Sequence, residues 1–272
     1  MEGHTSPRIL YLWPRRTVHV GQVKGIGEFS QAAASLMVSL EGPVKVMSAG
    51  MRVPTECSSL LLRAGQTVTI DAGEAVLGTC YLDALGQDYD MLLPCMAECR
   101  EGILCSVDGE AAYRDFFSQL LTETARTPEQ AYQVLEQLIN PRRRPYPEVD
   151  ARVAATVAMI QARVAENTAV EDLAAAVSLS VPRLVQLFRE QVGVPIRRYR
   201  LWHRLFVTAE GVGRGLSLTD AAITAGFNDS AHFCHSFRLI LGLKPSYIFP
   251  ALRDTRVCVS SMSNIAPAGS GL

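Results

Sequence analysis

The chain has 272 residues, of which 48% are apolar and 19% are charged, and its formal net charge is −1 at pH 7. This composition excludes a fully disordered chain, and no uncharged run is long enough for a transmembrane helix. The first residues lack the apolar core of a signal peptide, and the seven cysteines have no scaffold-like spacing, so we expect a cytoplasmic protein with reduced thiols and no membrane contact.

The two parts of the chain differ in charge. Residues 1–140 hold 10 Lys and Arg against 17 Asp and Glu, whereas residues 141–253 hold 15 against 9. The first part therefore carries a charge of −7 and the second a charge of +6. This split favours an acidic module joined to one that binds a polyanion, although ordinary surface charge is the alternative.

Residues from Ile9 to about Cys105 predict short strands. Alternating or β-branched runs such as RRTVHV (15–20) and VKV (44–46) are separated by Gly-Pro and Ala-Gly steps. The intervals between these turns are typical of an all-β barrel or sandwich. We therefore expect an N-terminal β-domain over residues 1–107.

Residues 108–140 predict two helices. Pro128 is a typical first-turn residue for the second helix. In the first helix, apolar side chains recur at three- and four-residue steps. This stripe either packs against the β-domain or forms the seam of a homodimer, and the dimerisation candidates are Tyr113, Phe116, Phe117 and Leu120.

The run NPRRRPYP (140–147) ends the helical pattern, because three prolines in eight residues cannot continue a helix. We assign residues 141–148 to a linker and residues 149–250 to an all-helical domain. Residues 251–272, which end in SNIAPAGSGL, are expected to be a disordered tail.

An internal repeat lies in the helical domain. VEDLAAAVS (170–178) resembles LTDAAITAG (218–226), and after a one-residue slip Phe188-Arg189 matches Phe237-Arg238. Each copy predicts a short helix, a turn, a longer helix and a glycine, which is the outline of a helix-turn-helix motif. A helix from roughly Pro195 to Glu210 joins the copies and would hold the two longer helices about one DNA turn apart, roughly 34–36 Å.

The longer helix of each copy has one apolar and one polar face. Leu184, Leu187 and Phe188 are expected to face inward in the first copy, and Phe233 and Phe237 in the second. The polar faces suit phosphates and base edges in a major groove, which is wide enough for a helix. A solvated face on a plain helical bundle is the alternative, and the matched spacing of two copies disfavours it.

These residues resemble the AraC/XylS family of bacterial transcription regulators over about Thr168 to Tyr247. The strongest part is AITAGFNDSAHFCHSFR (222–238) followed by GLKPSY (242–247), which is similar to the family's signature of Ala, Gly-Phe, Asp, His-Phe, Phe-Lys/Arg, Gly and Pro at fixed steps. The resemblance implies a regulator, with activation favoured over repression, that binds promoter double-stranded DNA as a homodimer, and RNA polymerase is a candidate partner. It also implies a multidomain α+β fold, with a cupin-like β-barrel and a helical dimerisation segment before the two helix-turn-helix motifs, and a small-molecule effector.

Candidate DNA contacts follow from the resemblance and from side-chain chemistry. The base-reading candidates are Gln186, Pro182, Val185, His232 and His235. In the longer helix of the first copy, here called the first reading helix, only Gln186 can hydrogen-bond a base. Pro182 and Val185 can touch a thymine methyl group. The family commonly has Arg where this chain has His235, and Arg can pair bidentately with guanine, whereas neutral His offers one donor and one acceptor. The phosphate candidates are Arg183, Arg189, Arg204 and Arg238.

The N-terminal domain carries no catalytic signature. Residues 1–140 contain two histidines without HxH spacing, so we expect no metal site, no cofactor and no enzyme activity. If PCMAEC (94–99) were helical, Cys95 and Cys99 would share a face, and together with Cys105 they are the effector or thiol-sensing candidates. Buried structural cysteine is the alternative. The competing function is a ligand-binding or enzymatic cupin barrel with a helical appendage.

Overall fold

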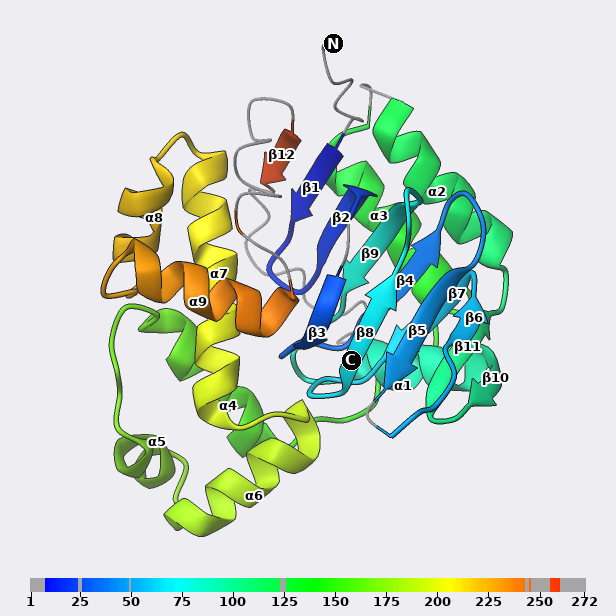
Figure 1. The fold of residues 1–272 in the computed structure, drawn as a ribbon. Coiled ribbons are helices and arrows are strands. Elements are labelled where there is room, and N and C mark those ends of the chain that lie inside the picture. The colour runs from blue at the N-terminus through cyan, green and yellow to red at the C-terminus, as the bar shows by residue number, and fades with distance from the viewer. Residues whose placement is uncertain are drawn as a thin grey trace.

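The structure is a computed structural model that describes residues 8–23, 26–48, 50–122, 126–242, 245 and 255–259. Figure 1 shows a β-rich N-terminal module beside a helical C-terminal module, which confirms the mixed α+β class. Among the described residues, no helix combines the length and the apolar character that crossing a membrane requires.

Two sheets build the N-terminal module. The larger sheet has eight strands, in the spatial order β10 (Met96–Arg100), β11 (Ile103–Val107), β7 (Ser59–Leu62), β4 (Ser35–Ser39), β9 (Val76–Tyr81), β2 (Thr17–Gln22), β1 (Arg8–Leu12) and β12 (Thr255–Val259). Its neighbours pair antiparallel except β1 and β12, which run parallel. The smaller, antiparallel sheet has the order β3 (Ile26–Ser30), β8 (Thr67–Asp71), β5 (Val44–Ser48) and β6 (Thr55–Cys57).

The expected cupin-like barrel is not closed. The described strands pair within one sheet or the other, and none of them pairs across the two sheets. The edge strands of the smaller sheet leave little ladder for closure, because β6 has three residues and the pairing of β3 with β8 shifts register between Ile26 and Phe29. The module is therefore an open pair of packed sheets.

Both faces of the larger sheet are buried, which explains its long apolar runs. On β4, Met37 belongs to the core between the two sheets, whereas Leu36 and Val38 belong to the core on the opposite face. On β7, Leu60 and Leu61 divide in the same way. The alternation of side chains along a strand thus supplies two cores from one sheet.

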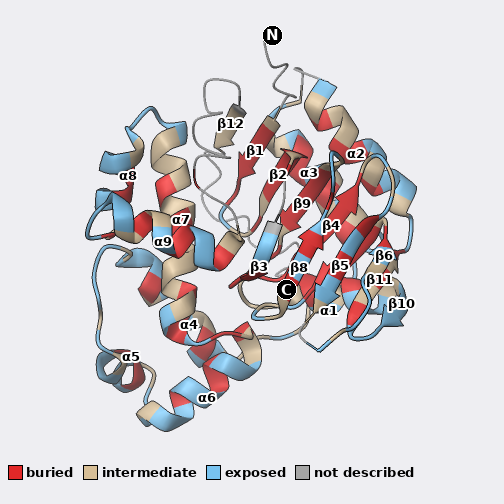
Figure 2. Ribbon diagram, viewed as in Figure 1, coloured by how far each residue is buried: buried red, intermediate tan, exposed pale blue. Residues whose placement is uncertain are grey.

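The outer face of the larger sheet is covered by α2 (Glu110–Thr122) and α3 (Pro128–Ile139), as Figure 1 shows. Pro128 opens α3, as the sequence predicts, and Thr127 caps it by accepting a hydrogen bond from the backbone N–H of Gln130. Figure 2 shows the inward sides of both helices as buried.

The apolar stripe of α2 is core. Tyr113, Phe116, Phe117 and Leu120 are each at most 2% exposed, and they pack in the cluster between the helices and the sheet. A Cβ at Gly78 of β9 would lie 2.3 Å from the ring of Phe117, so a glycine is needed where this ring meets the strand. These four side chains are therefore occupied within the protomer and are not free to form the dimer seam considered above.

The C-terminal module consists of α4 (Ala151–Ala162), α5 (Val170–Ala176), α6 (Val181–Val192), α7 (Ile196–Gly213), α8 (Leu218–Thr224) and α9 (Ser230–Leu241). Helices α5 and α6 form the first helix-turn-helix motif, α8 and α9 form the second, and α7 joins them (Figure 1). Gly193 and Gly242 end α6 and α9 in the left-handed conformation, with φ of 81° and 69°. The repeat seen in the sequence is thus a structural repeat.

The two modules share hydrophobic cores. Phe29 of β3 and Phe237 of α9 belong to one cluster of buried side chains. Ala32, which follows β3, and Val194, which follows α6, belong to another. Both helix-turn-helix motifs therefore dock on the N-terminal module.

The linker is also docked. Arg16, which precedes β2, donates hydrogen bonds to Asp88 on α1 (Gln87–Leu92), to Glu136 on α3 and to the hydroxyl of Tyr146 in the linker. The Tyr146 hydroxyl donates in turn to Glu136, with an oxygen–oxygen distance of 2.6 Å. This buried network fixes the linker to the N-terminal module.

One expectation for the C-terminal tail is wrong. Residues 255–259 lie within the segment expected to be disordered, but they form β12 and pair with β1. The pairing has a local basis, since TRVCV is rich in β-branched residues that suit a strand. The rest of that segment lies outside the described residues.

Candidate nucleic-acid interface

The first reading helix, α6, exposes the residues that the sequence singles out. Leu184, Leu187, Phe188 and Val192 are buried, while Pro182, Arg183, Val185, Gln186 and Arg189 are exposed. This division follows from the helical period, because residues three and four apart share a face. The structure thus brings all five candidate contacts of the first motif to the solvent-facing side of one helix.

Two hydrogen bonds within α6 hold the side chain of Gln186. The side-chain amide of Gln186 donates to Glu190 at 2.8 Å and accepts from Arg183 at 3.4 Å. Arg189 is exposed one turn further on. Contact between Gln186 and a base would therefore replace a hydrogen bond that already exists within the helix.

The second reading helix, α9, separates its two histidines. His235 and Arg238 are exposed, whereas His232 is half-buried. The Nδ1 atom of His232 accepts from the backbone N–H of Asn228, and its ring meets the ring of Phe227 edge-on at 5.3 Å. His232 therefore stabilises the turn of the motif, and His235 is the histidine that is free to face DNA.

Asp229 caps the start of α9, and Gly226 lies just after the end of α8. The carboxylate of Asp229 accepts from the backbone N–H of His232 at 2.6 Å, a cap that also places negative charge at the positive end of the helix. Gly226 has φ of +92°, and a Cβ at this position would lie 2.7 Å from the Cα of Ala165. These contacts give a physical reason for two residues of the family-like signature.

Arg204 is not placed to bind phosphate. It is 5% exposed, and its guanidinium donates to the carbonyl oxygen of Val164 at 3.0 Å and to the side chain of Asn167 at 2.9 Å, in the loop between α4 and α5. The phosphate prediction for Arg204 is therefore wrong, because the donors of this residue already satisfy carbonyl groups at the end of a helix.

Other arginines of α7 are also engaged within the protein. Arg198 donates to the carbonyl oxygen of Ser30, and Arg200 donates to that of Thr168. Burial lowers the pKa of both guanidinium groups. Arg197 is exposed. The positive charge along α7 thus serves domain packing as well as the surface.

Figure 1 shows the two motifs at opposite ends of α7. This helix has 18 residues, which corresponds to a length of about 27 Å. The joining helix ends three residues later than the sequence predicts, at Gly213. The spacing of one DNA turn between α6 and α9 stays a prediction.

The cysteine candidates do not form a common site. Cys95 lies in the 3₁₀-helix η1 (Leu93–Cys95) and Cys99 on strand β10, so the condition for a shared helical face is not met. Cys105 is buried, and a hydrogen bond with the Cys57 thiol lowers its pKa. Among the described residues, no three His, Cys, Asp or Glu side chains gather as a metal site would require.

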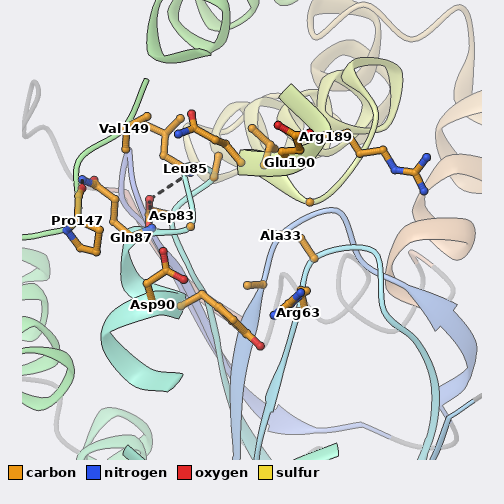
Figure 3. Close-up of a pocket in the computed structure, with 18 of the residues that line it drawn as sticks. Ala33, Arg63, Asp83, Leu85, Gln87, Asp90, Pro147, Val149, Arg189 and Glu190 are labelled. Carbon is orange, nitrogen blue, oxygen red and sulfur yellow. Dashed lines mark hydrogen bonds between the residues drawn. The ribbon is translucent and has the colours of Figure 1, made fainter. Parts of the chain in front are cut away.

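A cavity between the modules was not foreseen from the sequence. It has a volume of about 410 Å³, and it is lined by loops of the N-terminal module, by the end of the linker and by the last turn of α6. Figure 3 shows Asp83, Gln87 and Asp90 on one side of it, Arg63 below, and Glu190 on α6. Nothing in the sequence pattern pointed to this cavity, because its walls come from segments far apart in the chain.

Asp83 is the buried acid of this cavity. Its carboxylate accepts from the backbone N–H groups of Leu85, Gln87 and Asp88. Burial, together with the charge of Asp88, raises the pKa of Asp83 to about 6. The wall of the cavity therefore carries a buried carboxyl group that ionises less readily than a surface aspartate.

Comparison with known proteins agrees with this geometry. Residues 173–249 match the helix-turn-helix domain family. An apo form of ToxT from Vibrio cholerae is similar in structure, with a TM-score of 0.59 and 11% identity over 88% of this chain and 98% of that chain. ToxT bound to (E)-4-(8-methylnaphthalen-1-yl)but-3-enoic acid gives 0.55 and 11% over 86% and 98%, and unsaturated fatty acid bound ToxT gives 0.50 and 12% over 87% and 95%. A search of curated protein sequences found no match.

The ToxT structures show the fold, since their identity to this chain is low, and the matched family covers the two motifs. Together they confirm the resemblance derived from the repeat and the signature. Residues 173–249 thus form a helix-turn-helix domain of the matched family, which follows a β-rich N-terminal module, and the whole chain has the fold of ToxT.

Proposed function

We propose that this chain is a sequence-specific regulator in which α6 and α9 enter neighbouring major-groove segments of a promoter. One observation carries the proposal: the outward faces of both helices stay clear of the N-terminal module while the modules are docked. Gln186 and Arg189 on α6 and His235 and Arg238 on α9 are all exposed. A helix face of this kind fits the major groove.

The exposed residues divide by chemistry. Gln186 and His235 can hydrogen-bond base edges, and Pro182 and Val185 offer apolar contact to a thymine methyl group. Arg183, Arg189 and Arg238 supply cations for phosphates, which position the protein without reading sequence. His232 contributes through the turn that it stabilises.

Selection from a random duplex library with the full-length chain tests this function. We expect one enriched motif and an affinity for it that falls steeply with salt, because binding releases counterions from phosphates. The competing function, a ligand-binding or enzymatic barrel with a helical appendage, predicts no enriched sequence. Equal affinity for the enriched and the scrambled duplex would contradict the proposal.

We further propose that a small effector binds the cavity between the modules. Its volume of about 410 Å³ lies in the range of small-molecule sites. A ligand there would contact the N-terminal module, the linker and α6 together, so it could shift the relative position of the first motif. The acid-bound ToxT structures show ligand-bound forms of a protein with this fold.

Native mass spectrometry and thermal-shift screening of the full-length chain test the effector site. A ligand of this cavity should raise the melting temperature of the wild type, and the rise should shrink in Asp90→Asn and Gln87→Ala. Asp115→Asn, at an exposed acid of α2, is the matched control. An unchanged shift in both cavity variants would place the effector elsewhere.

Activation would require contact with RNA polymerase. Ile223 and Leu239 of the second motif are each 53% exposed, and large apolar side chains at this exposure suit a protein partner. We propose these two exposed side chains for the contact. Transcription in a purified system, with Ile223→Ser and Leu239→Ser that still bind DNA, tests it.

We also propose that the regulator works as a homodimer on repeated half-sites, through side chains other than the buried stripe of α2. Light scattering with and without DNA measures this state. If control is by thiol modification instead of an effector, exposed Cys99 is the candidate that a reagent reaches first.

A further inference from the structure

Strand β12 lies on the N-terminal sheet although it follows the DNA-binding helices in sequence. Its five residues pair in parallel with β1, from Arg8 opposite Thr255 to Leu12 opposite Val259. As the outermost strand of the sheet, it covers an edge of β1 that would otherwise expose unpaired N–H and C=O groups.

One face of β12 is turned to the DNA-binding module. A Cβ at Gly213, the last residue of α7, would lie 2.7 Å from Val257 Cγ1 and 2.9 Å from Val259 Cγ2. The ladder partners of the two valines are Leu10 and Leu12. These leucines line a small apolar space together with Leu205, Phe206 and Ala209 of α7. The valines therefore extend the surface on which α7 rests.

The opposite face of β12 holds the N-terminal module. Arg256 donates to the carbonyl oxygen of Leu120 in the last turn of α2 at 2.9 Å. Cys258 packs against the cluster that contains Ile9 and Tyr11. Because side chains alternate along a strand, residues 257 and 259 contact one module while residues 256 and 258 contact the other.

The end of α7 that meets β12 carries the second motif. A Cβ at Gly211 would lie 3.0 Å from the Cβ of Ala221, so α8 packs tightly on this last turn. Residues 256–259 are all only partly buried, and a short edge strand of this kind belongs to the less stable parts of a fold. The contact between β12 and the last turn of α7 is therefore placed to hold the second motif, and β12 belongs to a part of the fold that can open locally.

We propose that β12 is a strap that fixes the C-terminal end of α7, and with it the second helix-turn-helix motif, on the N-terminal module, and that its release from β1 lets this motif reorient. Only the consequence for DNA recognition rests on the proposed function. The strap itself is a property of the fold and can be tested without DNA.

Two truncations isolate the strap: residues 1–259, which keep β12, and residues 1–254, which lack it. Hydrogen exchange followed by mass spectrometry should be the same in 1–259 and the full-length chain. In 1–254 we expect exchange at least about tenfold faster in β1, in the last turn of α7 and in α8 and α9. Exchange in α4, α5 and α6 should not change.

The set of segments that exchange faster in 1–254 shows whether β12 holds α7 or only covers the edge of β1. Faster exchange confined to β1 would overturn the proposal, because β12 would then protect an edge without holding α7. If 1–254 does not fold, full-length Val257→Asp, which keeps the backbone of β12, is measured against Arg256→Gln. Protection of α7 and α8 that survives Val257→Asp would equally overturn it, whereas loss of that protection supports it.

Discussion

The guanidinium of Arg16 and the carboxylate of Asp88 form a two-pronged ion pair that is closed to solvent. The Nε–Oδ2 distance is 2.7 Å and the Nη2–Oδ1 distance is 2.6 Å, and both side chains are 0% exposed. Burial raises the pKa of Asp88, but the attraction of Arg16 outweighs it and holds that pKa below its usual range. The same guanidinium reaches Glu136 and Tyr146, so the pair also holds the linker.

Substitution of Arg16 should therefore lower the free energy of unfolding more than the same substitution of Arg15. Arg16→Met leaves the Asp88 charge buried and unpaired, and we expect the free energy of unfolding to fall by about 3–5 kcal/mol. Arg16→Met with Asp88→Leu should recover most of this loss. Urea unfolding measures both, and Arg15→Met, which loses one hydrogen bond to Gln87, is the control. Equal losses in Arg15→Met and Arg16→Met would contradict this account.

Gly226 and Gly215 offer a matched pair of substitutions. Their φ angles are +92° and +95°, so alanine is strained at both. A Cβ at Gly226 would meet the backbone of Ala165, whereas the space at Gly215 is open. We expect Gly226→Ala to lower the unfolding free energy by about 2 kcal/mol more than Gly215→Ala. Similar losses would show that backbone strain alone makes glycine necessary at Gly226.

Much of the helical domain could be predicted from the sequence because its signals are local. The stripe of Leu184, Leu187 and Phe188 follows from the period of a helix, and every member is buried. The same argument separates Gln186 and Arg189 to the exposed face. Repetition of the pattern at a fixed interval then identified two motifs where one would have been ambiguous.

The features that sequence analysis missed depend on partners distant in the chain. Nothing around Arg204 shows that it faces the loop of Val164 while Arg197 faces solvent, since both lie on a basic helix. The strand at residues 255–259 carried a weak signal in its β-branched residues, but its partner β1 is more than 240 positions away. The apolar stripe of α2 was predicted from the sequence. Whether it is core or interface depends on what packs against it, which is the larger sheet and α3.

Substitutions at Arg204 and Arg189 should have different effects, the first on stability and the second on DNA binding. Arg204→Met leaves carbonyl groups of the α4–α5 loop without donors, so we expect a loss of about 2–4 kcal/mol in unfolding free energy. Arg189→Ala should leave the melting temperature unchanged, weaken binding across all sequences and reduce the salt slope by about one. Thermal unfolding and anisotropy titrations at several salt concentrations measure the pair. A reduced salt slope in folded Arg204→Met would restore its role as a phosphate contact.

His19 should make the fold sensitive to acid. Burial, assisted by the charge of Arg8, lowers the pKa of His19 to about 4 from 6.5. The unfolded chain thus takes up the proton first as the pH falls, and stability is lost between about pH 6.5 and pH 4. By pH 5 this loss reaches about 2 kcal/mol. Urea unfolding gives the free energy of unfolding at pH 7.5 and at pH 5. The drop between the two pH values should be smaller by this amount in His19→Leu than in the wild type. An equal drop in the two proteins would contradict the assignment.

Gln186 is the sharpest test of base reading, because its amide must leave Glu190 to reach a base. Gln186→Ala should weaken discrimination at one base pair of the selected site by about 1–3 kcal/mol while the salt slope stays the same. Glu190→Ala frees the amide and removes a negative charge near the phosphates, so it should raise affinity for all duplexes and keep the base preference. Competition among duplexes that differ at one position measures both effects. If Gln186→Ala weakens selected and random DNA equally, Gln186 positions the helix and reads no base.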